Sequence, residues 1–202
     1  MSRENAKSRL LESAVAVFSE KGYAATIAEI ANAAEANIAA VNYHYGSKDE
    51  LFRQVLRRAF EQADSKFPIL APSGATPAQR LEAFMRGFLE RSLDPGPAGH
   101  FNRIMSKSIN SDDTPHELIF EEVQQLELKH LDQILRDLLE TNDDELLRFA
   151  TVNVISSSVI LSMNPRMRMH LFPDPPSPET LEAFIQRQTK GTLAFLSSLQ
   201  TT

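Results

Sequence analysis

The chain has 202 residues, a net charge of −6 and no cysteine. It is long enough to bury a hydrophobic core in one or two domains, and the lack of cysteine excludes disulfides, a thiolate nucleophile and cysteine-containing zinc sites. No apolar run approaches the roughly 18 residues of a membrane span, and no signal-peptide pattern opens the chain. We therefore expect a soluble, cytoplasmic protein without a membrane partner.

The acidic charge is unevenly distributed. Residues 1–60 contain eight Lys and Arg against seven Asp and Glu, so the acidic excess lies in the rest of the chain. A DNA-binding surface usually carries a basic patch. A nearly neutral N-terminal part permits such a surface without demonstrating it.

Apolar periodicity predicts helices along almost the whole chain and no strands. A first helix from about Arg3 to Lys21 has one apolar stripe, formed by Leu10, Ala14, Val17 and Phe18. Gly22 directly follows the last cation of this helix, as a C-cap glycine does. The proposed breaks leave about nine helices, of which the first 45 residues hold three. The fold class expected is therefore all-α.

Helix starts are marked by capping boxes, in which a Ser or Thr satisfies an orphan amide and a Glu or Gln three residues later bonds back to the cap. Four pairs have this spacing: Thr26 and Glu29, Ser47 and Glu50, Thr76 and Gln79, and Thr114 and Glu117. Pro77 and Pro115 are expected at the first helical position. Ser177 and Pro178 predict a further start without the box.

The stretch from Thr26 to Lys48 has the pattern of a helix-turn-helix. Two short helices are joined by a tight turn at residues 34–36 and follow a longer helix. On the second short helix, Ile38, Val41 and Tyr45 are spaced i, i+3 and i+7, which predicts that they face the core.

The remaining face of that second helix is small, polar and uncharged. Alanines allow close approach to the major groove and can contact thymine methyls, Asn can pair with adenine, and Tyr or His can bond phosphates. Lys48 is expected in the first turn of the next helix, where it can hold a phosphate. An ordinary polar surface is the alternative, and Tyr43 can instead be partly buried against the first helix. The cations Arg53, Arg57 and Arg58 are expected on a solvated helix face.

The run from Gly22 to Phe52 resembles the DNA-binding domain of the tetracycline-repressor (TetR) family. The matching segments are Gly22-Tyr23, Ala25-Thr26, Glu29-Ile30-Ala31, Tyr43-His44-Tyr45 and Ser47-Lys48-Asp49-Glu50-Leu51-Phe52. Within the family, the stretch from Asn37 to Lys48 is similar to a CerR-like branch. The resemblance implies DNA contacts by Thr26, Asn37, Ala39, Ala40, Asn42, Tyr43, His44 and Lys48.

Three features depart from the family pattern. Glu35 stands where the turn usually has glycine, the loop between Tyr23 and Ile27 is one residue short, and Asn42 replaces an aromatic residue. A left-handed backbone at Glu35 is strained, so we expect the turn to adopt a different geometry. Asn42 is expected to change sequence preference and not the docking mode.

The resemblance also implies a two-domain regulator, with DNA binding in residues 1–46 and ligand binding and dimerisation in residues 47–202. The resemblance implies that such a homodimer is a repressor that binds a pseudo-palindromic operator on double-stranded DNA, and that a small-molecule inducer releases it. The implied ligand pocket comprises Phe84, Phe88, Phe101, Met105, Phe120, Gln124 and His130. Plain core packing is the alternative for each of them.

Small and polar residues interrupt the apolar faces of the last two long helices, which suits close helix–helix packing. The resemblance implies that these two helices form the dimer interface with their copies. The residues assigned to this interface are Asn153, Ser157, Ile160, Phe184, Gln188, Gly191 and Phe195. Serines buried within one monomer are the alternative.

No motif predicts catalysis, a metal or a cofactor. The histidines lack metal-ligand spacing, and no glycine-rich phosphate loop or nucleophile elbow occurs. The expected function is therefore a ligand-responsive DNA-binding regulator and not an enzyme. One alternative is a ligand-binding helical protein with a weak or vestigial DNA-binding head, and another is an all-α enzyme that uses a histidine and carboxylates.

Overall fold

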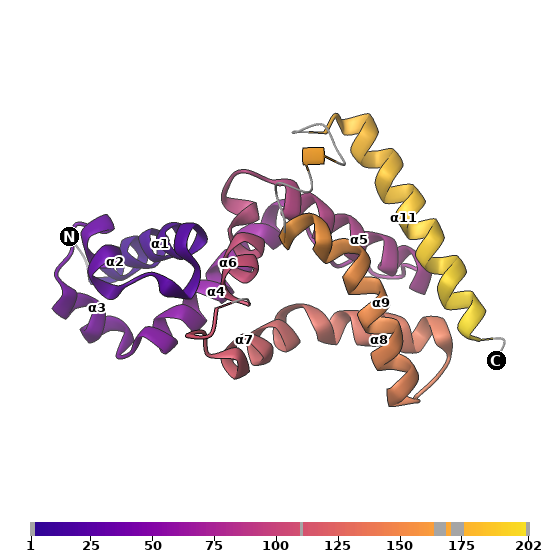
Figure 1. Ribbon diagram of the computed structural model, residues 1–202, viewed down its shortest axis with the longest axis horizontal. Helices are drawn as coiled ribbons and strands as arrows, with labels where there is room; N and C mark the ends of the chain where they lie inside the picture. Colours follow the sequence, from indigo (N-terminus) through magenta and orange to yellow (C-terminus); the bar gives the residue numbers. More distant parts are fainter. Residues whose placement is uncertain (1–2, 110, 164–168, 171–175, 201–202) are drawn as a thin grey trace. The chain divides into compact units, whose positions relative to one another are not determined.

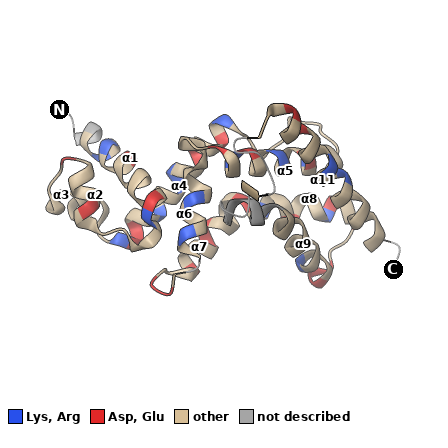
Figure 2. Cartoon of the chain, turned by 45° about the horizontal axis from the view of Figure 1, so that its top comes forward, with Lys and Arg blue, Asp and Glu red and all other residues tan. Residues whose placement is uncertain are grey.

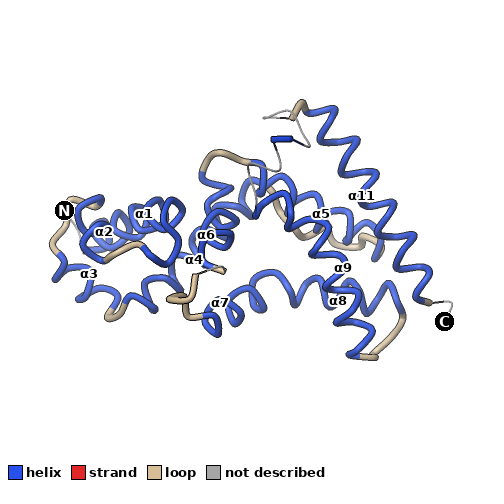
Figure 3. The backbone as a smooth tube through the Cα atoms, viewed as in Figure 1, coloured by secondary structure: helices blue, strands red, loops and turns tan. Residues whose placement is uncertain are grey.

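The protein was analysed as a computed structural model that describes residues 3–109, 111–163, 169–170 and 176–200. The side chains of residues 3–5 and 158–163 lie outside this description. All regular elements in the described ranges are helices (Figure 3). Helices α7 (His116–Val123) and α8 (Lys129–Leu139) join through a π-helical segment, Gln124–Leu128. With these two counted as one, the described ranges hold nine α-helices, which confirms the predicted fold class.

The helices form two compact units. The first unit contains residues 1–65 and 95–126, and the second contains residues 66–94 and 127–202. Within the described ranges, no helix is long and apolar enough to cross a membrane. The predicted functional boundary at residue 46 differs from these compact units and stays a prediction.

The first unit packs the N-terminal helices against α6 and α7 (Figure 1). Besides α7, this unit contains α1 (Arg3–Lys21), α2 (Ile27–Ala33), α3 (Ile38–Tyr45), most of α4 (Lys48–Lys66) and α6 (His100–Ser108). It also contains two 3₁₀ turns, Gly22–Ala24 and Pro97–Gly99. Aromatic rings fill its core: the Phe18 and Phe52 centroids lie 5.0 Å apart, and those of Phe60 and Phe101 lie 5.5 Å apart.

Helix α1 ends as the sequence predicts. Gly22 adopts a φ of +61°, a conformation that suits glycine. The Lys107 ammonium donates to the carbonyls of Ser19, at 3.0 Å, and Glu20. These carbonyls belong to the last turn of α1, where an ammonium both satisfies free acceptors and complements the helix dipole.

Two of the predicted capping boxes are complete, at Thr26 with Glu29 and at Thr76 with Gln79. The Ser47 hydroxyl accepts from the Glu50 amide at 3.1 Å, and the Ser177 hydroxyl accepts from the Thr180 amide at 3.2 Å.

The box predicted at Thr114 and Glu117 is wrong. Pro115 is the N-cap of α7, so the helix begins one residue later than the box requires. Thr114 is buried and its side chain caps nothing. At Thr76, by contrast, the proline that follows is the first helical residue, which leaves the threonine in the cap position.

The second unit is built around α5 (Pro77–Leu93), which packs against α8, α9 (Asp144–Met163) and α11 (Pro178–Leu199). Leu89 of α5 and Ile185 of α11 are fully buried in one hydrophobic cluster, against which Leu181 and Phe184 of α11 pack. The Arg86 guanidinium bonds the Glu182 carboxylate at 2.5 and 3.0 Å. This pair holds the pKa of Glu182 at about 2, chiefly through the hydrogen bond from Arg86.

Candidate DNA-binding surface

Helix α2 begins at a complete capping box. The Glu29 amide donates to the Thr26 hydroxyl at 3.2 Å, and the Thr26 amide donates to the Glu29 carboxylate at 2.9 Å. The Lys21 ammonium bonds the same carboxylate at 2.5 Å. The hydrogen bond from Lys21 is the main cause that lowers the pKa of Glu29 to about 2, so this carboxylate is ionised at neutral pH.

The turn between α2 and α3 has the geometry of a Schellman motif. The Glu35 amide donates to the Asn32 carbonyl at 3.1 Å, and the Ala36 amide donates to the Ala31 carbonyl at 2.9 Å. Glu35 occupies the left-handed position with φ of 50°. Our prediction of a different turn geometry at Glu35 is therefore wrong. Two hydrogen bonds hold the turn despite a left-handed cost of about 1–2 kcal/mol for a residue with a Cβ.

Helix α3 is capped at both ends. The Asn37 side-chain oxygen accepts from the Ala39 amide at 2.9 Å, and Gly46 ends the helix with φ of +73°. Val41 and Tyr45 are buried as predicted, and the Tyr45 hydroxyl donates to the Lys7 carbonyl at 2.8 Å. These contacts fix the rotation of α3 about its own axis.

Ile38 was predicted to face the core, and this prediction is wrong. It is the first residue of α3, and 47% of its surface is exposed. Helical side chains tilt toward the N-terminus, so at the first position the side chain extends past the turns of α3 that are packed on the core. The apolar spacing identified the stripe of α3, but it did not show where the packing of neighbouring helices over that stripe ends.

Most predicted DNA-contact residues lie on the surface of α2, α3 and the start of α4. Tyr43 is 70% exposed, so the alternative of burial against α1 is wrong. Ala40, His44 and Lys48 are half-buried, and the exposed members are Thr26, Asn37, Ala39, Asn42 and Tyr43. Helix α3 has no charged residue and is tan throughout in Figure 2. This leaves an uncharged exposed face on α3, with the cation Lys48 at the start of the helix that follows.

Lys48 is held against an aromatic ring. Its ammonium lies 4.1 Å from the centroid of Tyr23, and the Tyr23 hydroxyl donates to the Asp49 carboxylate. Tyr23 also packs edge-on against Phe52, with centroids 5.0 Å apart. Burial lowers the pKa of Lys48, although nearby carboxylates, Asp49 first, oppose the shift. The ring therefore orients a charged group at the N-terminus of α4.

The arginines of α4 bond carboxylates instead of facing solvent alone. Glu122, whose side chain is 2% exposed, accepts from Arg53 at 2.8 Å and from Arg57 at 2.8 Å through two nitrogens. Arg58 bonds Glu12 at 2.6 Å. These cations lie on a partly exposed face of α4, and their ion pairs also tie α4 to α7 and α1 within the first unit.

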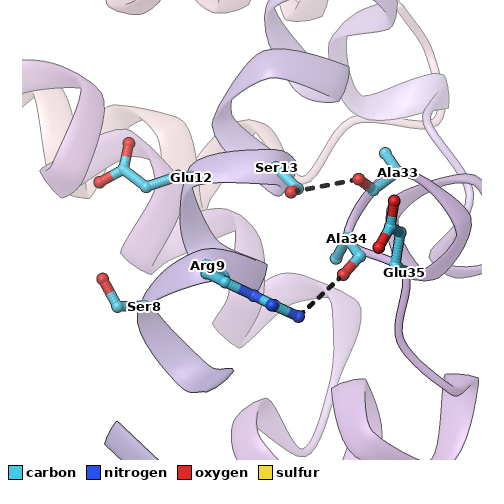
Figure 4. Close-up of a pocket in the computed structure, with 7 residues that line it drawn as sticks. All are labelled: Ser8, Arg9, Glu12, Ser13, Ala33, Ala34 and Glu35. Atoms are coloured by element: carbon cyan, nitrogen blue, oxygen red, sulfur yellow. Dashed lines mark hydrogen bonds between the residues drawn. The ribbon is translucent and has the colours of Figure 1, made fainter. Parts of the chain in front are cut away.

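A groove of about 410 Å³ lies between α1 and the end of α2 (Figure 4). Arg9 and Ser13 of α1 point toward the carbonyls of Ala34 and Ala33, each at 3.5 Å. Glu35 lines the same groove. These long side-chain bonds supply partners to carbonyls that the end of α2 leaves open.

The residues of the implied ligand pocket are divided between the two units. Phe101 and Met105 belong to the core of the first unit, where Phe120 is 64% exposed and Gln124 is half-buried. Phe84 is buried in the second unit, and Phe88 and His130 are half-buried there. None of the seven lines the groove just described or the second groove, which lies beside α5 in the second unit and includes Pro72 and Arg86.

The residues of the implied dimer interface are surface or half-buried positions of α9 and α11. Asn153 and Gly191 are exposed, whereas Ser157, Phe184, Gln188 and Phe195 are half-buried. The side chain of Ile160 lies outside the described residues. Phe149 and Val152 of α9, which the sequence analysis did not assign, are 52% and 62% exposed. Their apolar exposure is a signal that only the structure provides.

Residues 10–55 match the family model described as bacterial regulatory proteins, tetR family. Over this stretch the chain is similar to the N-terminal domain of that family. It is similar to the HTH-type transcriptional repressor KstR of Mycobacterium tuberculosis, with 35% identity over 96 residues, 47% of this chain and 43% of the relative. It is also similar to the HTH-type transcriptional dual regulator CecR of Shigella flexneri, with 49% identity over 49 residues, 24% of this chain and 22% of the relative.

The matched segments thus span less than half of these curated relatives, both of which are transcriptional regulators. The narrower resemblance to a CerR-like branch stays a prediction. Solved tetR-family structures extend the likeness of fold over nearly the whole chain. A transcriptional regulator from Rhodococcus sp. RHA1 has a TM-score of 0.67 and 23% identity, and it covers 93% of this chain and 96% of its own. The fatty acid degradation regulator FadR from Bacillus halodurans has a TM-score of 0.65, 17% identity and coverages of 92% and 97%.

Proposed function

We propose that this protein is a dimeric transcriptional regulator, a repressor, which binds a pseudo-palindromic DNA operator in the cytoplasm and is released by a small-molecule inducer. The observation that carries the proposal is the outward face of α3, which is uncharged, includes the small residues Ala39 and Ala40 and is fixed in rotation by Val41 and Tyr45. Such a helix fits the major groove, where bases are distinguished.

The individual contacts follow from the side-chain chemistry. The Asn37 oxygen already accepts the Ala39 amide, which leaves its amino group as a donor that does not compete with the cap. Asn42 is exposed on the same helix and has both amide atoms for bidentate pairing with adenine. Thr26, Tyr43, His44 and Lys48 are placed to bond phosphates, while Ala39 and Ala40 allow close approach.

We expect Asn42→Ala to weaken binding to the preferred operator by about 10–100-fold, because one bidentate base pair contact is worth about 1–3 kcal/mol. The probe is the duplex enriched by the wild-type protein from a randomised DNA library, and affinity is measured by fluorescence anisotropy at fixed salt. Asn32→Ala is the matched control, since Asn32 is an exposed asparagine of α2. Its affinity should stay within about twofold of wild type.

The same assay separates the main alternative. A ligand-binding protein with a vestigial DNA-binding head would enrich no sequence and form no salt-sensitive complex. A regulator should show both sequence selection and an affinity that falls as salt rises, because phosphate contacts release counterions. Equal loss of affinity in the Asn42 and Asn32 variants would contradict the assignment of Asn42.

We further propose that α9 and α11 form the dimer interface with their copies. The exposed Phe149 and Val152 and the ring contact between Phe149 and Phe195, with centroids 6.0 Å apart, support an apolar face there. A dimer would place two α3 helices in successive major grooves, about 34–36 Å apart. An inducer bound within residues 47–202 would act by favouring a conformer with another spacing, transmitted through α4.

Gly191→Arg tests the interface without disturbing the protomer. A Cβ at Gly191 meets nothing within 4 Å, so the larger side chain has room in the isolated fold. An unpaired charge buried between copies should raise the monomer–dimer dissociation constant by at least about 100-fold. Light scattering after size-exclusion chromatography should show a monomer, whereas Gln186→Arg, an exposed control on α11, should stay dimeric. A dimeric Gly191→Arg variant would place the interface elsewhere.

A further inference from the structure

Ile38 presents a large apolar side chain at the tip of the candidate DNA-binding surface. It is the first residue of α3, and 47% of its surface is exposed, whereas Val41 and Tyr45 are 1% and 4% exposed. Ile38 and Asn42 are separated by one helical turn, so they are neighbours on the surface of α3. The buried residues therefore position Ile38 without covering it.

The surface of α3 around Ile38 is uncharged. Helix α3 carries no charged side chain, and the exposed Ala39 directly follows Ile38. The adjacent Asn37 uses its side-chain oxygen to cap the Ala39 amide at 2.9 Å. At this end of the helix, the acceptor of Asn37 is thus engaged, and the isoleucine is the largest group available for contact.

An exposed isoleucine also loses little freedom when it is covered. Its branched Cβ restricts χ1 in a helix to essentially one rotamer. Contact with an apolar group therefore gains burial without ordering a flexible chain. In the major groove, only thymine presents such an apolar group, its 5-methyl.

We infer that Ile38 is a specificity-determining residue that packs on a thymine 5-methyl group in each operator half-site. This inference rests on the proposed function, because it requires α3 to lie in the major groove. It makes the beginning of α3 select a base by its methyl group, while Asn42, one turn later, selects by hydrogen bonds. The operator should then contain, in each half-site, a thymine whose recognition depends on Ile38.

The test removes the methyl group from the DNA and its partner from the protein. The probe is the duplex enriched by the wild-type protein from a randomised library, resynthesised with each thymine replaced in turn by deoxyuridine. At one position in each half-site, deoxyuridine should weaken binding of the duplex about fourfold, which corresponds to the burial of a single methyl group. Replacement at that position in both half-sites should weaken binding about 15-fold. In Ile38→Ala the same replacement should change affinity by less than about 1.5-fold.

Ile109→Ala is the matched control, because Ile109 is 41% exposed at the end of α6, outside the candidate surface. This variant should keep the full penalty for deoxyuridine. If Ile38→Ala keeps the penalty, or wild type shows none, the inference about Ile38 is overturned while the proposed function stands. If wild type enriches no sequence at all, both are overturned. Circular dichroism of each variant shows that the helices are intact.

Discussion

Gly87→Ala should lower the free energy of unfolding by about 2 kcal/mol, although alanine favours helices over glycine. A Cβ at Gly87 would lie 2.6 Å from the Pro68 carbonyl oxygen and 3.0 Å from its carbon. These are backbone atoms, so no side-chain rotation relieves the contact. The segment Phe67–Ile69 lies directly on α5 at this glycine, and the buried Arg91, one turn later, donates to the Phe67 carbonyl at 2.8 Å.

Urea denaturation followed by circular dichroism at fixed protein concentration measures this change. Lys190→Ala, at an exposed position of α11, is the control and should shift stability by less than about 0.5 kcal/mol. A gain in stability for Gly87→Ala, as helix propensity alone predicts, would show that the loop moves away from α5 at little cost.

Glu122→Ala should destabilise the protein by about 2–3 kcal/mol. The substitution removes the acceptor for three nitrogens of Arg53 and Arg57, each at 2.8 Å. Breaking a buried ion pair costs about 3–5 kcal/mol, but both arginines reach solvent, which reduces the loss. Glu121→Ala provides the control, because Glu121 bonds Arg53 from a side chain that is 61% exposed. Its effect should stay below about 1 kcal/mol.

The contribution of Glu122 should also depend on pH. Burial raises the pKa of this carboxyl, but the hydrogen bonds from Arg57 and Arg53 outweigh burial and leave the pKa below its usual value. A lowered pKa in the folded state stabilises the protein above the unfolded pKa, near 4.5, and the stabilisation is lost as the pH falls through the folded pKa. Glu122→Gln should therefore differ from wild type most at neutral pH and least once the pH has fallen below the folded-state pKa of Glu122. A difference that does not change with pH would exclude this account.

The parts of the fold that the sequence predicted depend on local chemistry. The capping boxes at Thr26 and Thr76 and the glycine after Lys21 each involve residues within one helical turn, so their spacing alone identifies them. The box at Thr114 failed because a proline is acceptable both as the cap and as the first helical residue. Spacing cannot decide which of the two positions Pro115 occupies.

The parts that were missed depend on long-range packing. The bonds from Arg53 and Arg57 to Glu122 join residues more than 60 positions apart, and no local pattern indicates them. Ile38 has the spacing of a core residue, but its exposure is set by where the neighbouring helices stop. At Glu35 the local rule against a left-handed residue was correct about strain, yet the hydrogen bonds of the turn prevailed.

Three polar side chains of α9, Asn153, Ser156 and Ser157, bond carbonyls of their own helix. The Asn153 amide donates to the Phe149 carbonyl at 2.8 Å, and Ser156 and Ser157 donate to carbonyls three or four residues back, at 2.6 and 2.8 Å. A partner that covers this face would not have to replace those hydrogen bonds. A stretch such as Asn-Val-Ile-Ser-Ser thus contains polar residues whose hydrogen bonds are already made within the helix. Shape complementarity, and not the matching of hydrogen bonds, then decides which surface packs on it.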